Sequence, residues 1–182
     1  MDFYGFYTGK IFDAYQYLGA HTEKTGVTFR TFAPSASRIA VIGEFNDWQE
    51  SEMNKVYDGN FWECYIPEAK PGQMYKYRIY DRNDNPVDHC DPYGFGMELR
   101  PNSASIVRDM SKYKFKDSKW MQNRSDCRKK PLNIYEIHFG SFRKPSDKTD
   151  DWYTYEEMID ILIPYLTENG YNCLEIMPLN EY

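Results

Sequence analysis

The sequence has little cysteine and no long hydrophobic run, and each shortage excludes a class of protein. The cysteines stand singly and far apart, so neither a CxxC zinc site nor a redox pair is predicted, and we expect reduced thiols and no metal or cofactor. No segment approaches the roughly 20 apolar residues of a membrane helix. Residues 1–5 include Asp2 and no apolar run, so no secretory signal is visible. These features predict a cytoplasmic protein with no membrane partner.

The sequence contains fewer basic than acidic residues, whereas aromatic residues are abundant. The 182 residues include 22 Lys and Arg against 28 Asp and Glu, a net charge of −6 that argues against a nucleic-acid partner. Aromatic content reaches 18%, which fits β-structure because flat rings pack well on a pleated surface. The same excess fits sugar binding, because a ring face can stack on a pyranose. Composition alone leaves both interpretations open.

Short strands separated by turns predict a β-sandwich over residues 19–110. Strand-like segments occupy residues 26–32, 38–43, 61–66, 74–80 and 87–89. Within residues 74–80 the alternation places Tyr75 and Tyr77 on one face and Lys76 and Arg78 on the other. The lysine is therefore expected on the solvent side of its strand.

The chain changes character after the sandwich. Residues 111–131 are polar and basic, and we interpret them as a solvated linker rather than a site for an anionic ligand. A strand over residues 132–138 and a strand over 171–177 enclose a helix that begins with a capping box of Thr154 and Glu157. Pro164 is expected to kink or divide this helix, and Gly170 to end it. Strand, helix and strand form one βαβ unit with parallel pairing.

The predicted organisation has four parts. An N-terminal segment spans 1–18, the sandwich 19–110, the linker 111–131 and the α/β part 132–182. One βαβ unit cannot close a core, and the chain ends directly after its second strand. We therefore expect the sequence to be the front of a longer protein.

Several segments carry a resemblance to a known family. They are residues 18–21 (Leu-Gly-Ala-His), 26–34, 43–48 (Gly-Glu-Phe-Asn-Asp-Trp), 72–77, 91–94, 135–142 and 175–181. In this order they resemble the glycogen (1,4-α-glucan) branching enzymes of glycoside hydrolase family 13, preceded by a family 48 carbohydrate-binding module. The resemblance implies an immunoglobulin-like β-sandwich followed by the first βαβ unit of a truncated (β/α)8 barrel. The implied partners are α-1,4-glucan or glycogen and the remainder of the catalytic barrel.

The resemblance also implies an activity for the longer protein, a transferase that forms α-1,6 branches. In the family, the nucleophile, the acid/base and a third carboxylate belong to barrel strands four, five and seven, which lie beyond Tyr182. No catalytic residue is therefore assigned, and we expect the chain alone to be inactive. Two alternatives remain open. One is a free-standing glucan-binding or regulatory module, and the other is a debranching hydrolase of the same layout.

Three residues are candidates for carbohydrate binding. Trp48 is either a stacking platform for glucose rings or a core residue, and its polar neighbours favour exposure. Lys76 matches a donor to sugar hydroxyls in related modules and is otherwise an ordinary surface lysine. Asn46 could donate to the sugar or cap its own turn. Trp62, inside a strand, is assigned to the core.

Two further clusters receive structural interpretations. Glu136 and His138 share a strand face, where an acid/base or metal pair is conceivable and a structural role is favoured. Residues 89–91 (His-Cys-Asp) could ligate a metal, but no second cluster supports this.

Overall fold

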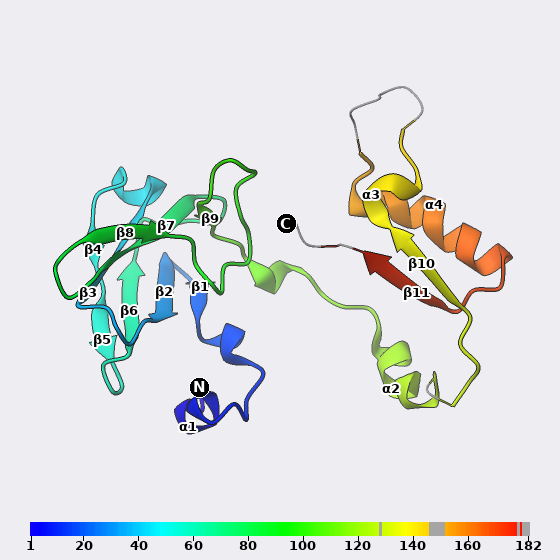
Figure 1. The fold of residues 1–182 in the computed structure, drawn as a ribbon, viewed down its shortest axis with the longest axis horizontal. Helices are drawn as coiled ribbons and strands as arrows, with labels where there is room; N and C mark the ends of the chain where they lie inside the picture. Colours follow the sequence, from blue (N-terminus) through cyan, green and yellow to red (C-terminus); the bar gives the residue numbers. More distant parts are fainter. Residues whose placement is uncertain (128, 146–151, 178, 180–182) are drawn as a thin grey trace. The chain divides into compact units, whose positions relative to one another are not determined.

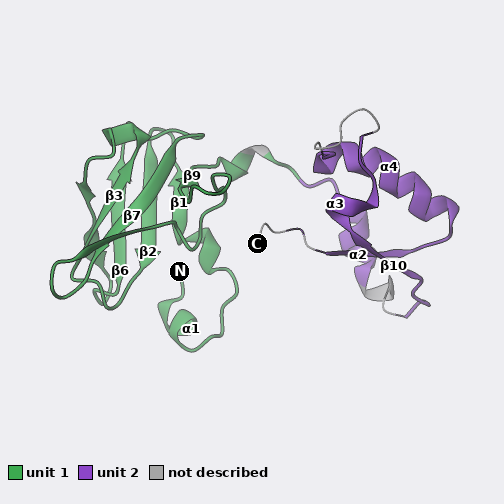
Figure 2. Ribbon diagram, turned by 45° about the horizontal axis from the view of Figure 1, so that its top comes forward, with its two compact units in different colours: residues 1–114 green, residues 115–182 purple. Residues whose placement is uncertain are grey.

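The structure is a computed structural model that describes residues 1–127, 129–145, 152–177 and 179 (Figure 1). The chain divides into two compact units, residues 1–114 and residues 115–182 (Figure 2). The first unit holds the β-sheets and the second a small α/β arrangement. No helix in the described part of the chain is long and apolar enough to cross a membrane.

Two antiparallel sheets form the first unit, as the sequence predicts. One sheet has the order β1 (Gly19–Thr22), β2 (Val27–Phe32), β6 (Phe61–Ile66) and β5 (Asn54–Val56). The other has the order β4 (Ser51–Glu52), β3 (Arg38–Gly43), β7 (Met74–Tyr80) and β8 (Pro86–His89), and β9 (Ser105–Ile106) also pairs with β7. The short strands β1, β4, β5 and β9 are additions to the strands predicted from the sequence.

The sandwich core lies between the inner faces of the two sheets. Phe29 of β2 and Tyr75 of β7 are fully buried, and their rings meet edge to face with centroids 4.9 Å apart. Trp62 is 3% exposed and its indole nitrogen donates to the Ala33 carbonyl at 3.1 Å, which confirms its assignment to the core. Aromatic rings thus pack between the sheets together with aliphatic side chains such as Ile39 and Val41, and each ring buries a large area.

The N-terminal segment packs on the sandwich through aromatic side chains. Helix α1 (Phe3–Tyr7) begins at Asp2, whose carboxylate caps the Gly5 amide at 2.9 Å, and the short helix η1 (Ala14–Gln16) follows. Phe3 stacks on Tyr57 at 4.1 Å and meets the edge of Phe61. Phe61 points to the outer face of its sheet and is nevertheless fully buried, because α1 covers it.

The second unit contains the predicted βαβ arrangement. Strands β10 (Ile134–His138) and β11 (Cys173–Met177) pair in parallel, and α3 (Phe139–Phe142) and α4 (Tyr155–Glu168) lie between them in sequence. The capping box of Thr154 and Glu157 is confirmed, and Pro164 lies within α4 without ending it. Helix α2 (Ser118–Cys127) occupies part of the segment predicted to be a linker, after the short helix η3 (Met110–Lys112).

Helix α4 buries one face and leaves another open. Met158, Leu162 and Leu166 are at most 8% exposed and pack with Ile137 of β10. Ile159 and Ile163, one residue further along the helix in each case, are 56% and 52% exposed. The adjoining groove has a volume of about 470 Å³ and is lined by apolar side chains from α4 and β11. The described part of unit 2 therefore presents an apolar surface.

Candidate carbohydrate-binding site

The outer face of the β4–β3–β7–β8 sheet carries the predicted site. Tyr75 and Tyr77 are fully buried, whereas Lys76 and Arg78 point to the opposite face, as the alternation predicts. The register pairs Lys76 with Ile42 and Arg78 with Ala40 of β3. Paired residues share a face, but Ala40 and Ile42 are buried, so on these two strands the cationic side chains of β7 lie over buried apolar residues of β3.

A tight loop at the end of β3 presents Trp48. The strand ends at Gly43, the short helix η2 (Glu44–Asn46) follows, and both Asp47 (φ +53°) and Trp48 (φ +59°) adopt the left-handed region. The Trp48 amide donates to the Gly43 carbonyl at 2.8 Å, which closes the loop. Trp48 is 39% exposed, so the structure confirms the predicted exposure and excludes a core position. Left-handed conformations are unfavourable for large residues, and such strain is concentrated at functional sites.

Asn46 holds this loop together. Its side-chain oxygen accepts from the Gly43 amide at 2.9 Å, and its side-chain nitrogen donates to the Val41 carbonyl at 3.1 Å and to the Ser51 hydroxyl at 2.9 Å. These hydrogen bonds give Asn46 the local role that was the alternative interpretation of the sequence. A direct contact between Asn46 and sugar stays a prediction.

Glu50 ties the Trp48 loop to the outer face of the sheet. Its carboxylate accepts hydrogen bonds from Arg38 at 2.8 Å, from Arg78 at 3.3 Å and from the Tyr80 hydroxyl. The hydrogen bond from Tyr80, together with those from both arginines, lowers the pKa of Glu50. The carboxylate therefore stays ionised, two residues beyond Trp48, where it links β3 and β7.

Lys76 faces a second loop that sequence reasoning missed. Its ammonium group donates to the Ser103 hydroxyl at 3.1 Å. The loop of residues 97–104 is closed by Glu98, which accepts from the Ala104 amide at 2.9 Å, and it carries Leu99, which is 80% exposed. No spacing in the sequence connects residue 103 to residue 76, because their contact depends on the pairing of β9 with β7.

Asn46, Trp48 and Lys76 thus belong to one end of one sheet. The Trp48 amide is hydrogen-bonded to Gly43, and Gly43 directly follows Ile42 in β3. Ile42 is paired with Lys76 of β7. An exposed indole and a lysine ammonium suit a sugar, which offers an apolar ring face and hydroxyl groups. This end of the sheet is therefore the candidate site.

The described residues contain no group of three or more His, Cys, Asp or Glu side chains that could hold a metal. In the 89–91 segment, the carboxylate of Asp91 accepts hydrogen bonds from Tyr75 and Tyr77 inside the sandwich. Glu136 and His138 are exposed on β10, where their register partners in β11 are Glu175 and Met177. Asp91 thus serves the interior of the sandwich, and a structural role for Glu136 and His138 stays a prediction.

Comparison with known proteins identifies the module. Residues 17–94 match the family Carbohydrate-binding module 48 (Isoamylase N-terminal domain). The matched segment includes Asn46, Trp48 and Lys76.

Over its whole length the chain is similar to 1,4-alpha-glucan branching enzymes. It is 41% identical to the enzyme GlgB of Fusobacterium nucleatum and 38% identical to GlgB of Bacillus caldolyticus, in both cases over 100% of this chain. The chain spans 30% and 28% of the length of these two relatives. The resemblance predicted from the sequence is therefore confirmed.

Solved structures support the fold. The glycogen-degrading pneumococcal virulence factor SpuA superposes with a TM-score of 0.69 at 21% identity, over 93% of this chain and 20% of that protein. A maltotriose complex of a PulA mutant from Klebsiella pneumoniae gives a TM-score of 0.53 at 23% identity, over 70% of this chain and 16% of that protein. At this identity the likeness concerns the fold alone, a β-sandwich followed by a βαβ unit.

Proposed function

We propose that the chain is the N-terminal part of a glycogen branching enzyme. Such an enzyme cuts an α-1,4-glucan, holds the piece as a glycosyl-enzyme and passes it to a 6-hydroxyl group. The observation that carries the proposal is the 41% identity to a branching enzyme over the full chain, including the βαβ unit. A free-standing binding module has no use for that unit. A cytoplasmic location for the enzyme is part of the same proposal.

Within this protein, unit 1 binds α-1,4-glucan through Trp48 and Lys76. The half-exposed indole offers its face to a glucose ring, and the Lys76 ammonium, with Ser103 beside it, donates to sugar hydroxyls. One stacking platform is worth about 1–3 kcal/mol by analogy with bases stacked on aromatic rings. A weak affinity, millimolar to high micromolar, follows.

The apolar surface of unit 2 is assigned to the remainder of the barrel. Ile159 and Ile163 are more than half exposed, and a βαβ unit buries such residues when further barrel strands and helices pack beside it. The curated relatives are more than three times as long as this chain. The additional length of such a protein would supply the segment that covers this apolar surface.

Trp48→Ala tests glucan binding. In an affinity gel that contains glycogen, the variant should lose retention, with an affinity reduced about tenfold. Its melting temperature should stay nearly unchanged, because a half-exposed side chain contributes little to the core. The matched control is Trp120→Ala, which removes a 60% exposed tryptophan from α2 in unit 2. Unchanged retention of Trp48→Ala would remove Trp48 from the site.

The activity is tested separately. The 182-residue chain, incubated with amylose, should leave the iodine-complex absorbance unchanged, whereas the longer protein that contains it should lower the absorbance and add α-1,6 linkages. A longer protein that only releases short chains would be a hydrolase and would contradict the proposal.

A further inference from the structure

A cavity in unit 1 is lined by none of the residues of the Trp48 loop. It has a volume of about 350 Å³ and is built by η1, β1 and the segments around residues 95 and 108–111. The lining used below comprises Tyr15, His21, Thr22, Phe95, Arg108 and Ser111. Four of these six residues lie outside the 17–94 segment that matches the module family. The cavity is therefore distinct from the candidate site on the outer face of the other sheet.

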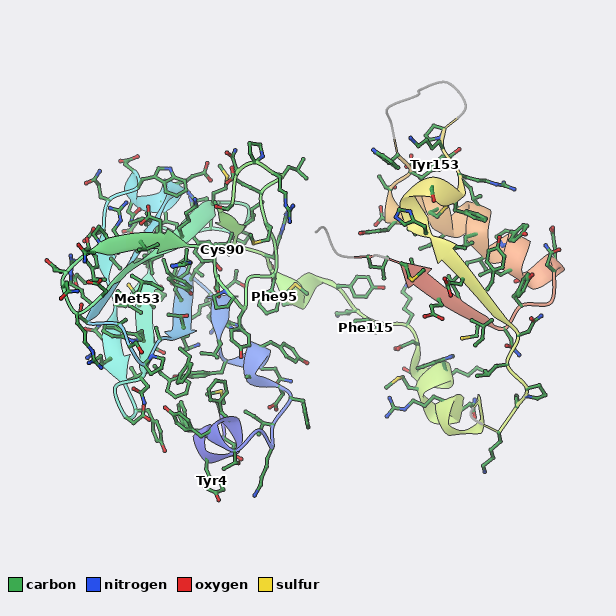
Figure 3. The ribbon with its side chains drawn as sticks, viewed as in Figure 1. Tyr4, Met53, Cys90, Phe95, Phe115 and Tyr153 are labelled. Atoms are coloured by element: carbon green, nitrogen blue, oxygen red, sulfur yellow. The ribbon has the colours of Figure 1, made fainter. Side chains whose placement is uncertain are left out.

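Aromatic rings form one part of the cavity. Tyr15 of η1 is 50% exposed, and Phe95, labelled in Figure 3, meets the His21 ring edge to face with centroids 5.8 Å apart. These rings offer apolar faces of the kind that stack on a pyranose. The volume falls at the small end of ligand cavities, which suits about one sugar unit.

His21 supplies a defined polar group. Its Nε2 atom lies 2.9 Å from the Leu18 carbonyl oxygen. Because a carbonyl only accepts, Nε2 carries the hydrogen, and in the neutral ring Nδ1 is an acceptor for a sugar hydroxyl. The Asp91 carboxylate interacts electrostatically with His21, but it is buried, is bonded to Tyr75 and Tyr77, and does not line the cavity.

Arg108 gives the cavity its charge. The lining contains no Asp or Glu, although acidic residues outnumber basic ones in the chain. Among the described residues, none of the recorded ion pairs involves Arg108. A Cβ atom on Gly96 would approach the Arg108 Nε atom to 2.7 Å, so the absence of a side chain at Gly96 lets the arginine lie against the backbone.

That backbone is itself held in place. The Ile106 amide donates to the Gly96 carbonyl at 2.7 Å, and the Glu98 amide donates to the Ala104 carbonyl at 2.9 Å. The wall that carries Phe95 and Arg108 is therefore a hydrogen-bonded ladder. Binding groups on such a wall are positioned before a ligand arrives.

We infer that this cavity binds a phosphorylated glucose unit. The aromatic rings face the sugar ring, His21 accepts from a hydroxyl group, and the guanidinium fork of Arg108 pairs with the phosphate oxygens in a bidentate manner. The phosphate can belong to a free hexose phosphate or to a phosphate ester on a glucan chain, since both present the same group.

The test follows the backbone amide signals of the 182-residue chain by NMR during titrations with glucose 6-phosphate, glucose, inorganic phosphate and a dextrin that carries 6-phosphate esters. Glucose 6-phosphate should shift the signals of residues 20–22, 95 and 108. Glucose and inorganic phosphate should each bind with an affinity at least about tenfold lower than that of glucose 6-phosphate. Tighter binding of the dextrin, measured at the signals of residues 20–22, 95 and 108, would identify the polymer as the source, and equal binding the free sugar phosphate. Shifts at residues 46–48 would report the separate glucan site.

Variants at Arg108 and Gly96 decide the assignment. Arg108→Gln should reduce the affinity about tenfold or more. Arg108→Lys should reduce it by less, because lysine keeps the positive charge but cannot make the bidentate contact of the guanidinium group. Gly96→Ala should also weaken binding by displacing the Arg108 side chain. Trp120→Ala, at a 60% exposed position in unit 2, should leave the affinity unchanged. The melting temperatures establish that each variant is folded, and Tyr15→Ala provides a further variant at an exposed position.

Contrary results are equally distinct. Equal affinity for glucose and glucose 6-phosphate would overturn the assignment to a phosphorylated ligand, as would unchanged affinity in folded Arg108→Gln. Absence of any shift at residues 20–22 at millimolar ligand would overturn the site itself. None of these outcomes affects the proposed glucan site, which is tested by glycogen retention.

Discussion

The carboxylate of Asp91 accepts a hydrogen bond from the Tyr75 hydroxyl at 2.6 Å inside the sandwich. The Tyr77 hydroxyl donates to the same oxygen at 3.1 Å, and the Tyr93 amide donates to the other oxygen at 2.8 Å. Asp91 is 4% exposed, and its burial raises the pKa of the carboxyl group, although the hydrogen bonds act in the opposite direction. One acidic side chain thus satisfies two buried tyrosines.

Asp91→Ala should destabilise unit 1. The substitution leaves the buried Tyr75 hydroxyl without its acceptor and leaves the Tyr77 hydroxyl with only the Arg30 carbonyl at 3.4 Å, so the free energy of unfolding should fall by about 1–3 kcal/mol. Urea unfolding measures this change. Asp91→Asn keeps one acceptor oxygen and the volume, and should lose less. An alanine variant as stable as the parent chain would contradict the assigned role.

Asp91 should also give stability a pH dependence of defined sign. Its pKa in the folded chain exceeds the unfolded value of about 3.9. From about pH 4 up to the folded pKa, the folded chain therefore binds more protons than the unfolded chain, and this contribution to stability decreases as the pH rises. Asp91→Asn should remove this part of the dependence when unfolding curves are compared between pH 4 and pH 8.

At alkaline pH the two tyrosines should limit stability. Burial, followed by the charge of Asp91, raises the pKa of both Tyr75 and Tyr77. Above about pH 10 the unfolded chain loses these protons while the folded chain keeps them, so stability falls as the pH rises. Tyr75→Phe should make this decrease less steep, whereas Tyr4→Phe, at a 69% exposed position, should not. Equal slopes in all three proteins would contradict the prediction.

The apolar face of unit 2 should bind a hydrophobic dye. Ile159→Lys, at a position 56% exposed on α4, should lower the fluorescence of bound 8-anilinonaphthalene-1-sulfonate and change stability by no more than about 0.5 kcal/mol. Met158→Lys is the control on the buried face and should unfold the unit, because it places a charge in the core. Dye binding that survives Ile159→Lys unchanged would mean that the dye binds elsewhere.

The local patterns in the sequence predicted the parts of the site that depend on neighbours in the chain. The two-residue period of β7 places Lys76 outside and Tyr75 inside, and the polar residues around Trp48 predict its exposure. The capping box of Thr154 and Glu157 is local in the same sense. In each case residues a few positions apart decide the outcome.

The remaining features depend on contacts between distant segments. Ser103 reaches Lys76 only because β9 pairs with β7, and Phe95 reaches His21 across more than 70 residues of sequence. The short strand β9 has two residues, too few for a period to be seen. A single sequence without long-range pairing information cannot predict such contacts.

Glu50 gives a test of how the Trp48 loop is held. Its carboxylate connects the loop to Arg38 and Arg78, so Glu50→Gln should weaken the connection and allow the indole to move. Since exposed ion pairs contribute up to about 1 kcal/mol, glycogen affinity should fall by no more than about fivefold, less than in Trp48→Ala.

The matched control is Glu52→Gln, which removes an ion pair to the same Arg38 but lies in β4, beyond the loop. It should leave glycogen retention unchanged.

The contribution of Glu50 depends on pH with the opposite sign to that of Asp91, because the pKa of Glu50 is lowered in the folded chain. Its contribution is present above the unfolded value of about 4.3 and is lost as the pH falls through the folded pKa. Retention of the parent chain should therefore weaken as the pH falls through the lowered pKa of Glu50, while Glu50→Gln shows no such step. Equal effects of Glu50→Gln and Glu52→Gln would mean that the surface charge, and not the anchoring of the loop, controls the affinity.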